Sequence, residues 1–223
     1  MTIKNNTNVI FDLDDTLYYE VDFLKSAYKE IAVKIAANIG VSNVLVYNKM
    51  LEYFFDKKNI FQEILSEYQA SFSTLELLNI YRNHKPEIKL SKDRKVTLNH
   101  LKSKNINLGL LTDGRSVQQR NKIKALQLDN WFSKIIISEE FGSEKPNVKN
   151  YKYFEQVFGL GKYYYIGDNI SKDFISPNKL GWHTVCLMDH GLNIHRQNFS
   201  LVNEACLPQH TINKFLDVLD IIN

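Results

Sequence analysis

The chain has 223 residues, of which 44% are hydrophobic and 24% are charged, a composition typical of a globular protein that can bury a sizeable core. Its 28 basic and 25 acidic residues give a formal net charge of only +3, and like charges form no long blocks. This distribution does not indicate a protein that binds nucleic acid or a membrane surface.

The cysteines and the N-terminus favour a reducing compartment. Cys186 and Cys206 have neither the spacing of a disulfide framework nor that of a zinc site. The polar residues 1–8 lead into an apolar run that is too short for a signal peptide, and no apolar stretch reaches the length of a membrane span. We therefore expect a cytoplasmic protein, and its oligomeric state stays open.

The first expected element is a short buried strand at residues 8–11. These residues form an apolar run rich in β-forming side chains, and the run ends abruptly in the acidic segment Asp12-Leu13-Asp14-Asp15. Side chains alternate along a strand, but that rule relaxes once the strand has ended. Asp12 and Asp14 can therefore face one site.

Residues 23–81 have a different character, because apolar side chains recur there every three or four positions. This spacing predicts a set of amphipathic helices. A connection of about 60 residues is much longer than the usual connections within compact domains. We therefore expect a helical cap at residues 19–85, inserted into an α/β core that is formed by residues 1–18 and 86–223.

From Pro86 onwards, expected helices and strands alternate at regular spacing. The expected strands are residues 106–111, 134–138, 163–168 and 183–187, and the expected helices are residues 92–102, 116–126 and 148–158, with one more that begins near residue 171. This alternation predicts a doubly wound parallel sheet, in which ligands bind beyond the carboxyl ends of the strands. Three of the expected strands end there with Asp12, Thr112 or Asp168.

These strand-end residues suit phosphoryl transfer. Asp12 can act as a nucleophile, but its negative charge repels a phosphate dianion unless a cation offsets the repulsion. Oxygen ligands from Asp12 and Asp168 suit Mg²⁺, and Asp173 is placed to complete the surroundings of the metal. Asp14 is then available as a general acid or base.

The phosphate itself needs hydrogen-bond donors and positive charge. Thr112 offers a hydroxyl, while Asp113 and Gly114 offer backbone N–H groups in a turn that leads into a helix, an arrangement that binds anions. Lys145 offers a point charge, and the proline that follows it stiffens the loop.

At this point four segments resemble a known family. Residues 12–16, 111–114, 144–146 and 167–173 resemble, in order and spacing, the motifs of the haloacid dehalogenase (HAD) superfamily. The helical insertion after the first motif is similar to that of the subgroup with a mobile α-helical cap, which includes phosphoglycolate phosphatases and small-sugar phosphatases. The resemblance covers nearly the whole chain and implies a Rossmann-like HAD core.

The resemblance implies a role for each acidic residue. Asp12 would form an aspartyl-phosphate, and Asp14 would protonate the leaving group, activate water and bind Mg²⁺ through its backbone carbonyl. Asp168 would be the remaining protein ligand of the metal, and Asp173 would support the metal waters or Lys145. Thr112, Asp113, Gly114 and Lys145 are the expected phosphate-binding residues, and Thr112 and Lys145 join Asp12 and Asp14 as catalytic residues.

The expected activity is therefore Mg²⁺-dependent hydrolysis of a small phosphorylated metabolite. A sugar phosphate is slightly favoured, because no feature of the sequence indicates that a nucleobase is recognised. The alternatives are a phosphomutase, a nucleotidase and a catalytically idle module that senses a phosphorylated metabolite. A dehalogenase is disfavoured, because it needs neither Asp14 nor Asp168.

Further polar and aromatic residues are expected to be structural. Asp15 is expected to be a solvated turn residue outside the site, and the tyrosines at 163–165 to belong to the core. His190 and His195 are expected on the surface. Two groups near the cap boundaries could either pack or meet the substrate: Tyr18, Tyr19, Glu20 and Phe23 at the first, and Arg82, Asn83 and His84 at the second.

Overall fold

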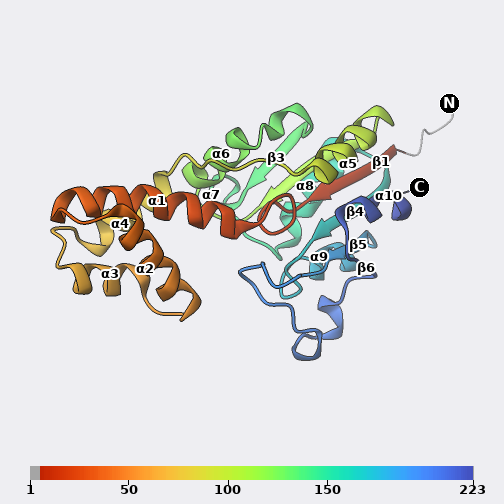
Figure 1. Cartoon of the computed structure of the whole chain (residues 1–223). Helices are drawn as coiled ribbons and strands as arrows, with labels where there is room; N and C mark the ends of the chain where they lie inside the picture. The colour runs from red at the N-terminus through yellow and green to blue at the C-terminus, as the bar shows by residue number, and fades with distance from the viewer. Residues whose placement is uncertain (1–5, 223) are drawn as a thin grey trace.

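The computed structural model describes residues 6–222, and its centre is a six-stranded sheet in the order β3-β2-β1-β4-β5-β6 (Figure 1). Every neighbouring pair of strands is parallel. The strands are β1 (Asn6–Phe11), β2 (Asn107–Thr112), β3 (Lys134–Ile137), β4 (Gly161–Gly167), β5 (His183–Leu187) and β6 (His210–Ile212). The expected doubly wound α/β fold is confirmed, and the five expected strands are all present.

Strand β6 was not expected from the sequence. It has three residues, of which His210 and Thr211 are exposed, so it lacks the continuous apolar run that marks the buried strands. It pairs with β5 at the edge of the sheet.

Helices and short 3₁₀ turns surround the sheet. The helices of the core are α5 (Lys92–Ser103), α6 (Ser116–Ala125), α7 (Ser138–Phe141), α8 (Val148–Phe158), α9 (Ile175–Lys179) and α10 (Val218–Ile221). The 3₁₀ turns are η1 (Leu128–Asn130), η2 (Phe199–Leu201), η3 (Glu204–Cys206) and η4 (Phe215–Asp217). The expected helices at residues 92–102, 116–126 and 148–158 are confirmed to within one residue, and the one expected near residue 171 begins at Ile175.

Both faces of the sheet are buried, as is usual for parallel sheets. Val9 and Phe11 of β1 pack into one hydrophobic cluster, whereas Ile10 between them packs into a second cluster on the other face. The tyrosines of β4 follow the same alternation, since Tyr164 belongs to the first cluster and its two neighbours to the second. Their expected place in the core is therefore confirmed.

Four helices between β1 and α5 form a separate lobe beside the sheet, the helical lobe (residues 20–83; Figure 1). They are α1 (Glu20–Ile39), α2 (Asn43–Phe55), α3 (Ile60–Tyr68) and α4 (Thr74–Asn83). The lobe has its own hydrophobic cluster, which includes Leu24, Ile31, Met50 and Ile64. Its helices are thus held together by their own apolar faces. We interpret the lobe as the expected cap, and the boundaries at residues 18–19 and 85–86 stay a prediction.

Two chain segments connect the helical lobe to the core, and hydrogen bonds hold both of them in place. In the first, the guanidinium of Arg94 donates a hydrogen bond of 3.0 Å to the carbonyl of Thr16. In the second, the buried His84 ring lies 2.7 Å from the Ser26 hydroxyl and 2.6 Å from the Glu30 carboxylate. His84 therefore ties the second connection to α1.

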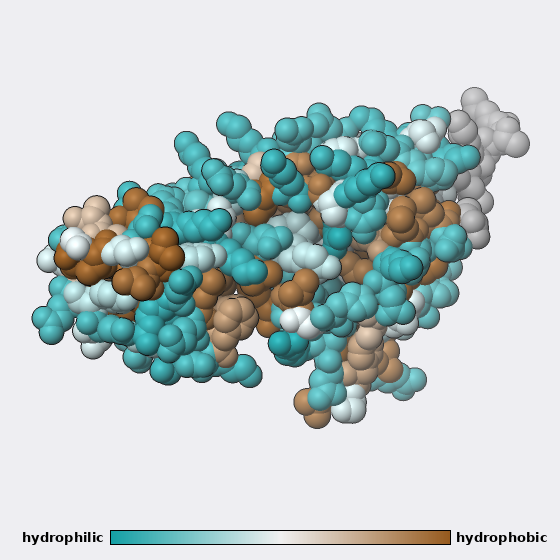
Figure 2. All heavy atoms as spheres, in the orientation of Figure 1, coloured by the Kyte–Doolittle hydropathy of each residue, from teal (hydrophilic) through white to brown (hydrophobic). Residues whose placement is uncertain are grey.

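Hydrophilic side chains cover most of the face shown in Figure 2, and its outline is indented between the helical lobe and the C-terminal part of the chain. Among residues 6–222, no helix combines the length and the apolar character that crossing a membrane requires.

Candidate active site

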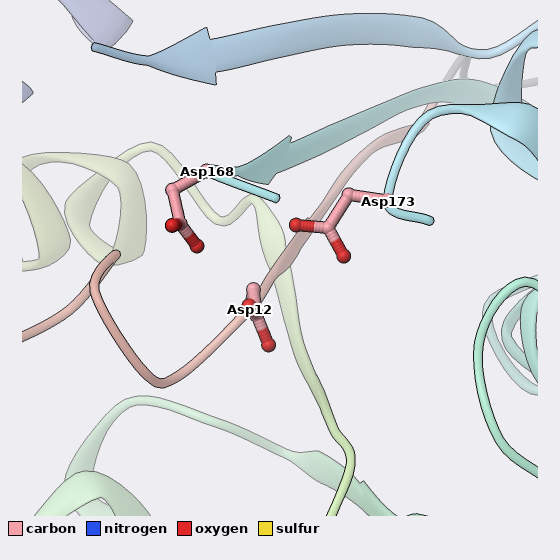
Figure 3. Close-up of side chains that lie close together, drawn as sticks. All are labelled: Asp12, Asp168 and Asp173. Carbon is pink, nitrogen blue, oxygen red and sulfur yellow. The ribbon is translucent and has the colours of Figure 1, made fainter. Parts of the chain in front are cut away.

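Three buried carboxylates converge at the carboxyl ends of the central strands (Figure 3). Asp12 follows β1 directly, Asp168 follows β4 directly, and Asp173 lies in the turn that precedes α9. One oxygen from each carboxylate lies within 4.8 Å of the other two. Because neighbouring parallel strands end at one edge of the sheet, β1 and β4 bring together residues that are far apart in sequence.

One buried lysine partly balances these charges. The Lys145 ammonium lies 2.7 Å from Asp12 Oδ1 and 2.8 Å from Asp173 Oδ1. Burial raises the pKa of Asp12 to about 7 although Lys145 opposes this rise, and burial together with Asp173 and Asp12 raises the pKa of Asp168 to about 9. Both pKa values rise because several carboxylates lie close together where little water is present to solvate their negative charge.

This donor set fits a divalent cation. Three carboxylates face a single ammonium, and a bound Mg²⁺ would offset the remaining negative charge through the oxygen ligands that it prefers. Asp12, Asp168 and Asp173 are thus the residues whose side chains could hold the metal. The carboxylate of Asp14 is not in this group.

Asp173 is fixed from several sides. Its Oδ1 accepts the hydrogen bond from Lys145, and its Oδ2 accepts one of 2.9 Å from the Asn169 N–H. The main chain at Gly167 passes so close that a Cβ there would lie 2.4 Å from Asp173 Oδ2. Because Gly167 has no side chain, the Asp173 carboxylate can occupy this space.

Asp14 lies in the same cavity, but its carboxylate turns towards helix α6. It accepts hydrogen bonds from Lys122 Nζ at 2.7 Å and Gln119 Nε2 at 2.9 Å, and a short one from the Tyr18 hydroxyl. Burial by itself raises the pKa of Asp14, but the charge and hydrogen bond of Lys122, together with the hydrogen bonds from Tyr18 and Gln119, hold this pKa below its ordinary value.

Lys122 and Gln119 were not among the residues expected at the site. Lys122 is almost completely buried and also lies 3.7 Å from the carboxylate of Glu20, while Gln119 also donates a hydrogen bond of 2.6 Å to the Thr112 hydroxyl. The two residues are three positions apart on the helix that follows the Thr112 turn, so they share a helix face. This spacing is the signal that could have found them.

Three of the four expected phosphate-binding residues lie at the cavity. Thr112, Asp113 and Lys145 line the cavity with Asp12, but Gly114 does not. The Gly114 N–H donates a hydrogen bond of 2.9 Å to the Ser138 hydroxyl, so it is not free to bind a phosphate. The expected role of Gly114 therefore does not fit its place in the fold.

Asp113 has a connecting role that the sequence did not indicate. Its backbone N–H was the group expected to bind the phosphate. The carboxylate accepts hydrogen bonds from the Lys145 N–H at 3.0 Å and from Lys172 Nζ at 2.8 Å. Asp113 thus joins the ends of three strands around the site.

Asp15 is also placed differently from the expectation. It is a turn residue with a φ of 54°, but it is buried and not solvated. Its carboxylate accepts hydrogen bonds from the N–H groups of Glu20 at 2.8 Å and Ile194 at 2.9 Å, and burial raises its pKa to about 6. Asp15 therefore ties the start of the helical lobe to the segment after β5.

The cavity that contains these groups has a volume of about 110 Å³. It is lined by Asp12, Asp14, Asp15, Glu20, Thr112, Asp113, Lys145, Asp168, Asn169, Lys172 and His195. A larger cavity of about 630 Å³ lies beside the second connection, among Lys25, His84 and their neighbours, but none of the strand-end carboxylates reaches it. The chemistry therefore belongs to the smaller cavity.

Comparisons with known proteins agree with this arrangement. The family model of the haloacid dehalogenase-like hydrolases matches residues 9–187. A glyceraldehyde 3-phosphate phosphatase from Methanocaldococcus jannaschii is 28% identical over 227 residues, which cover 96% of each chain. A protein of the same name from Methanopyrus kandleri is 26% identical over 235 residues, again covering 96% of each chain.

Solved structures show the same fold. The HAD-hydrolase YfnB from Bacillus subtilis, bound to magnesium, has a TM-score of 0.70 with this chain at 20% sequence identity. The match covers 99% of this chain and 100% of that chain. The likeness therefore includes both the sheet and the helical lobe.

Proposed function

The chain belongs to the haloacid dehalogenase-like hydrolases, and we propose that it is a Mg²⁺-dependent phosphatase that hydrolyses a short sugar phosphate through an aspartyl-phosphate at Asp12. The observation that carries this proposal is the position of the Asp12 carboxylate. It lies 2.7 Å from the Lys145 ammonium and within 4.8 Å of the carboxylates of Asp168 and Asp173, in a cavity whose wall also holds Asp14.

In the first step, an oxygen of Asp12 attacks the phosphorus atom, and the bond between phosphorus and the ester oxygen breaks. The leaving oxygen needs a proton, which Asp14 supplies in its protonated form. The Lys145 ammonium and the Thr112 hydroxyl stabilise the negative charge on the phosphoryl oxygens. The product alcohol departs, and the phosphoryl group stays on Asp12.

In the second step, Asp14 accepts a proton from a water molecule, and this water attacks the phosphorus atom of the aspartyl-phosphate. The bond between phosphorus and the Asp12 oxygen breaks, which releases inorganic phosphate, restores the Asp12 carboxylate and leaves Asp14 with the proton that it gave up in the first step. Mg²⁺ held by Asp12 and Asp168, with Asp173 beside them, would offset the repulsion between the nucleophile and the phosphate. Lys122 and Gln119 keep Asp14 at the cavity between these steps.

The substrate class is supported by two observations. Both relatives that match along nearly the whole chain are named glyceraldehyde 3-phosphate phosphatases. The cavity is small, with a volume of about 110 Å³, and its wall is formed largely by charged and polar side chains. A three-carbon sugar phosphate therefore fits the site better than a nucleotide. The helical lobe, which contributes Glu20 to the wall, would act as the cap.

A substrate panel tests this proposal. Purified protein is incubated with glyceraldehyde 3-phosphate, hexose phosphates and nucleoside monophosphates, with Mg²⁺ or with a chelator, and released phosphate is measured. We expect the highest kcat/KM for the three-carbon substrate and no release with the chelator. A lack of phosphate release from every substrate would favour the idle sensor, whereas turnover that depends on an added bisphosphate would favour a phosphomutase.

A further inference from the structure

Part of the segment between β5 and β6 contacts the active site. We call residues 189–197 the strap. Its first residue, Asp189, accepts hydrogen bonds from the N–H groups of Gly191, Leu192 and Asn193 at 2.6, 2.9 and 3.0 Å. The strap thus begins in a compact turn that its own hydrogen bonds hold.

Side chains of the strap bind Asp168 directly. Asn193, which is buried, donates a hydrogen bond of 2.9 Å from Nδ2 to Asp168 Oδ2. Gln197 donates from Nε2 to the carbonyl oxygens of Asp168 at 2.7 Å and Leu187 at 2.9 Å. These bonds fix both the side chain and the main chain of the residue that follows β4.

The residue after Asn193 links the strap to the helical lobe. The Ile194 N–H donates to the Asp15 carboxylate, and the Ile194 side chain packs against the hydrophobic cluster of the lobe. Asn193 and Ile194 therefore hold the chain on two sides of the cavity, one at a metal-binding carboxylate and the other at the lobe.

His195 comes next and is part of the cavity wall. Its side chain is exposed and has no hydrogen bond or ion pair with any other residue in the range 6–222. Other polar groups of the wall already have strong partners, since Lys172 pairs with Asp113 and Lys145 pairs with Asp12. His195 therefore lines the cavity with a ring whose two nitrogens have no hydrogen-bond partner among the described residues.

We propose that His195 is a specificity-determining residue that hydrogen-bonds an oxygen of the substrate beyond the phosphate, and that Asn193 and Ile194 hold it in place. This inference rests on the proposed phosphatase activity. A neutral imidazole has one donor and one acceptor, which suits a hydroxyl or carbonyl oxygen on a short carbon chain. Such a site discriminates against an analogue that lacks this oxygen.

The test compares glycerol 3-phosphate with propyl phosphate, two esters of similar length that differ in their hydroxyls. The wild-type protein should prefer glycerol 3-phosphate. His195→Ala should raise the KM for this substrate up to about tenfold, the loss expected for one hydrogen bond, and should change kcat/KM for propyl phosphate less than about twofold. An equal effect on both esters, or no effect on either, would overturn the assignment.

His190→Ala is the matched control. His190 belongs to the strap and is exposed, but its ring bonds the carbonyl of Asn213 and does not line the cavity. Its removal should leave both substrates unaffected. His195→Gln, which keeps a donor and an acceptor, should recover part of the preference for glycerol 3-phosphate.

The anchoring role of Asn193 has a separate readout. Titration calorimetry with Mg²⁺ should show a dissociation constant about 10 to 100 times higher in Asn193→Ala, because a partner that orients Asp168 is lost. His195→Ala should bind Mg²⁺ like the wild type. Normal Mg²⁺ binding in Asn193→Ala would refute its positioning role.

A failure of the proposed activity can be distinguished from a failure of this inference. If the wild-type protein releases phosphate neither from these two esters nor from any substrate of the panel described above, the proposed function fails. Calorimetric binding of the two esters then tests His195 by itself. Tighter binding of glycerol 3-phosphate than of propyl phosphate, lost in His195→Ala, would support the recognition role, and equal binding would overturn it.

Discussion

The Lys122 ammonium lies 2.7 Å from the carboxylate of Asp14, and this ion pair joins helix α6 to the turn after β1. Lys122 is almost completely buried, and it also faces Glu20 at the start of the helical lobe. One lysine of the core thus holds the expected acid-base residue and the first turn of the lobe together.

Replacing this lysine should affect both stability and turnover. Lys122→Met leaves the largely buried carboxylates of Asp14 and Glu20 without their cation, and we expect a loss of about 1–3 kcal/mol in the free energy of unfolding. Phosphatase activity should also fall. Chemical denaturation and steady-state kinetics measure the two effects. Lys124→Met, an exposed change on the same helix, serves as the control and should alter neither.

Removing the nucleophile should stop the reaction without unfolding the protein. Asp12→Asn keeps the side-chain volume, and it removes a carboxylate whose pKa burial has raised to about 7. We expect turnover to fall by at least about a thousandfold, with a thermal midpoint no lower than that of the wild type. Phosphate release and differential scanning fluorimetry provide the measurements. Wild-type turnover in this variant would refute the assignment of Asp12.

Asp14→Asn should separate the two chemical steps. The amide can neither protonate the leaving group nor accept a proton from water, so we expect turnover to fall by about 10² to 10⁴-fold. Any phosphoryl group transferred to Asp12 should then persist. Intact-protein mass spectrometry after rapid acid quenching should detect the added phosphoryl mass. Rapid turnover without accumulation would show that another group acts as the acid and base.

Magnesium should stabilise the protein through the three strand-end carboxylates. Mg²⁺ at a hundred times its dissociation constant should add about 2.7 kcal/mol, which raises the thermal midpoint by several degrees. Asp168→Asn should unfold at a higher temperature than the wild type without metal, because it relieves buried repulsion, and should lose most of the Mg²⁺ effect. The exposed change Asp129→Asn should behave like the wild type. An unchanged Mg²⁺ effect in Asp168→Asn would contradict the proposed metal site.

Gly167→Ala should disturb the site through a steric contact. The new Cβ would lie 2.4 Å from Asp173 Oδ2, so Asp173 must move away from Lys145. We expect a loss of about 1–3 kcal/mol in stability and a clear decrease in kcat. Ser171→Ala, at an exposed position of the same turn, is the control and should have little effect. Unchanged kcat in Gly167→Ala would show that the position of Asp173 is not critical.

The local pattern of apolar and polar residues was sufficient to predict most of the strands and the helical lobe. Each expected strand is a short apolar run that stops at polar or acidic residues, and a parallel sheet places all such ends at one edge. Asp12, Thr112 and Asp168 could therefore be assigned to one site from the sequence. The helical lobe could also be predicted from the sequence, because its apolar side chains recur at helical spacing over a stretch too long for a connection.

Only the tertiary structure decided which partners these residues have. Lys122 is one of two lysines on α6, and its burial beside Asp14 depends on how that helix lies against the turn after β1. The strap has no periodic pattern, because irregular segments are held by individual hydrogen bonds and not by a repeating face. His195 therefore looked like an ordinary surface histidine, and its place on the cavity wall follows from Asn193 and Ile194, whose partners lie elsewhere in the chain.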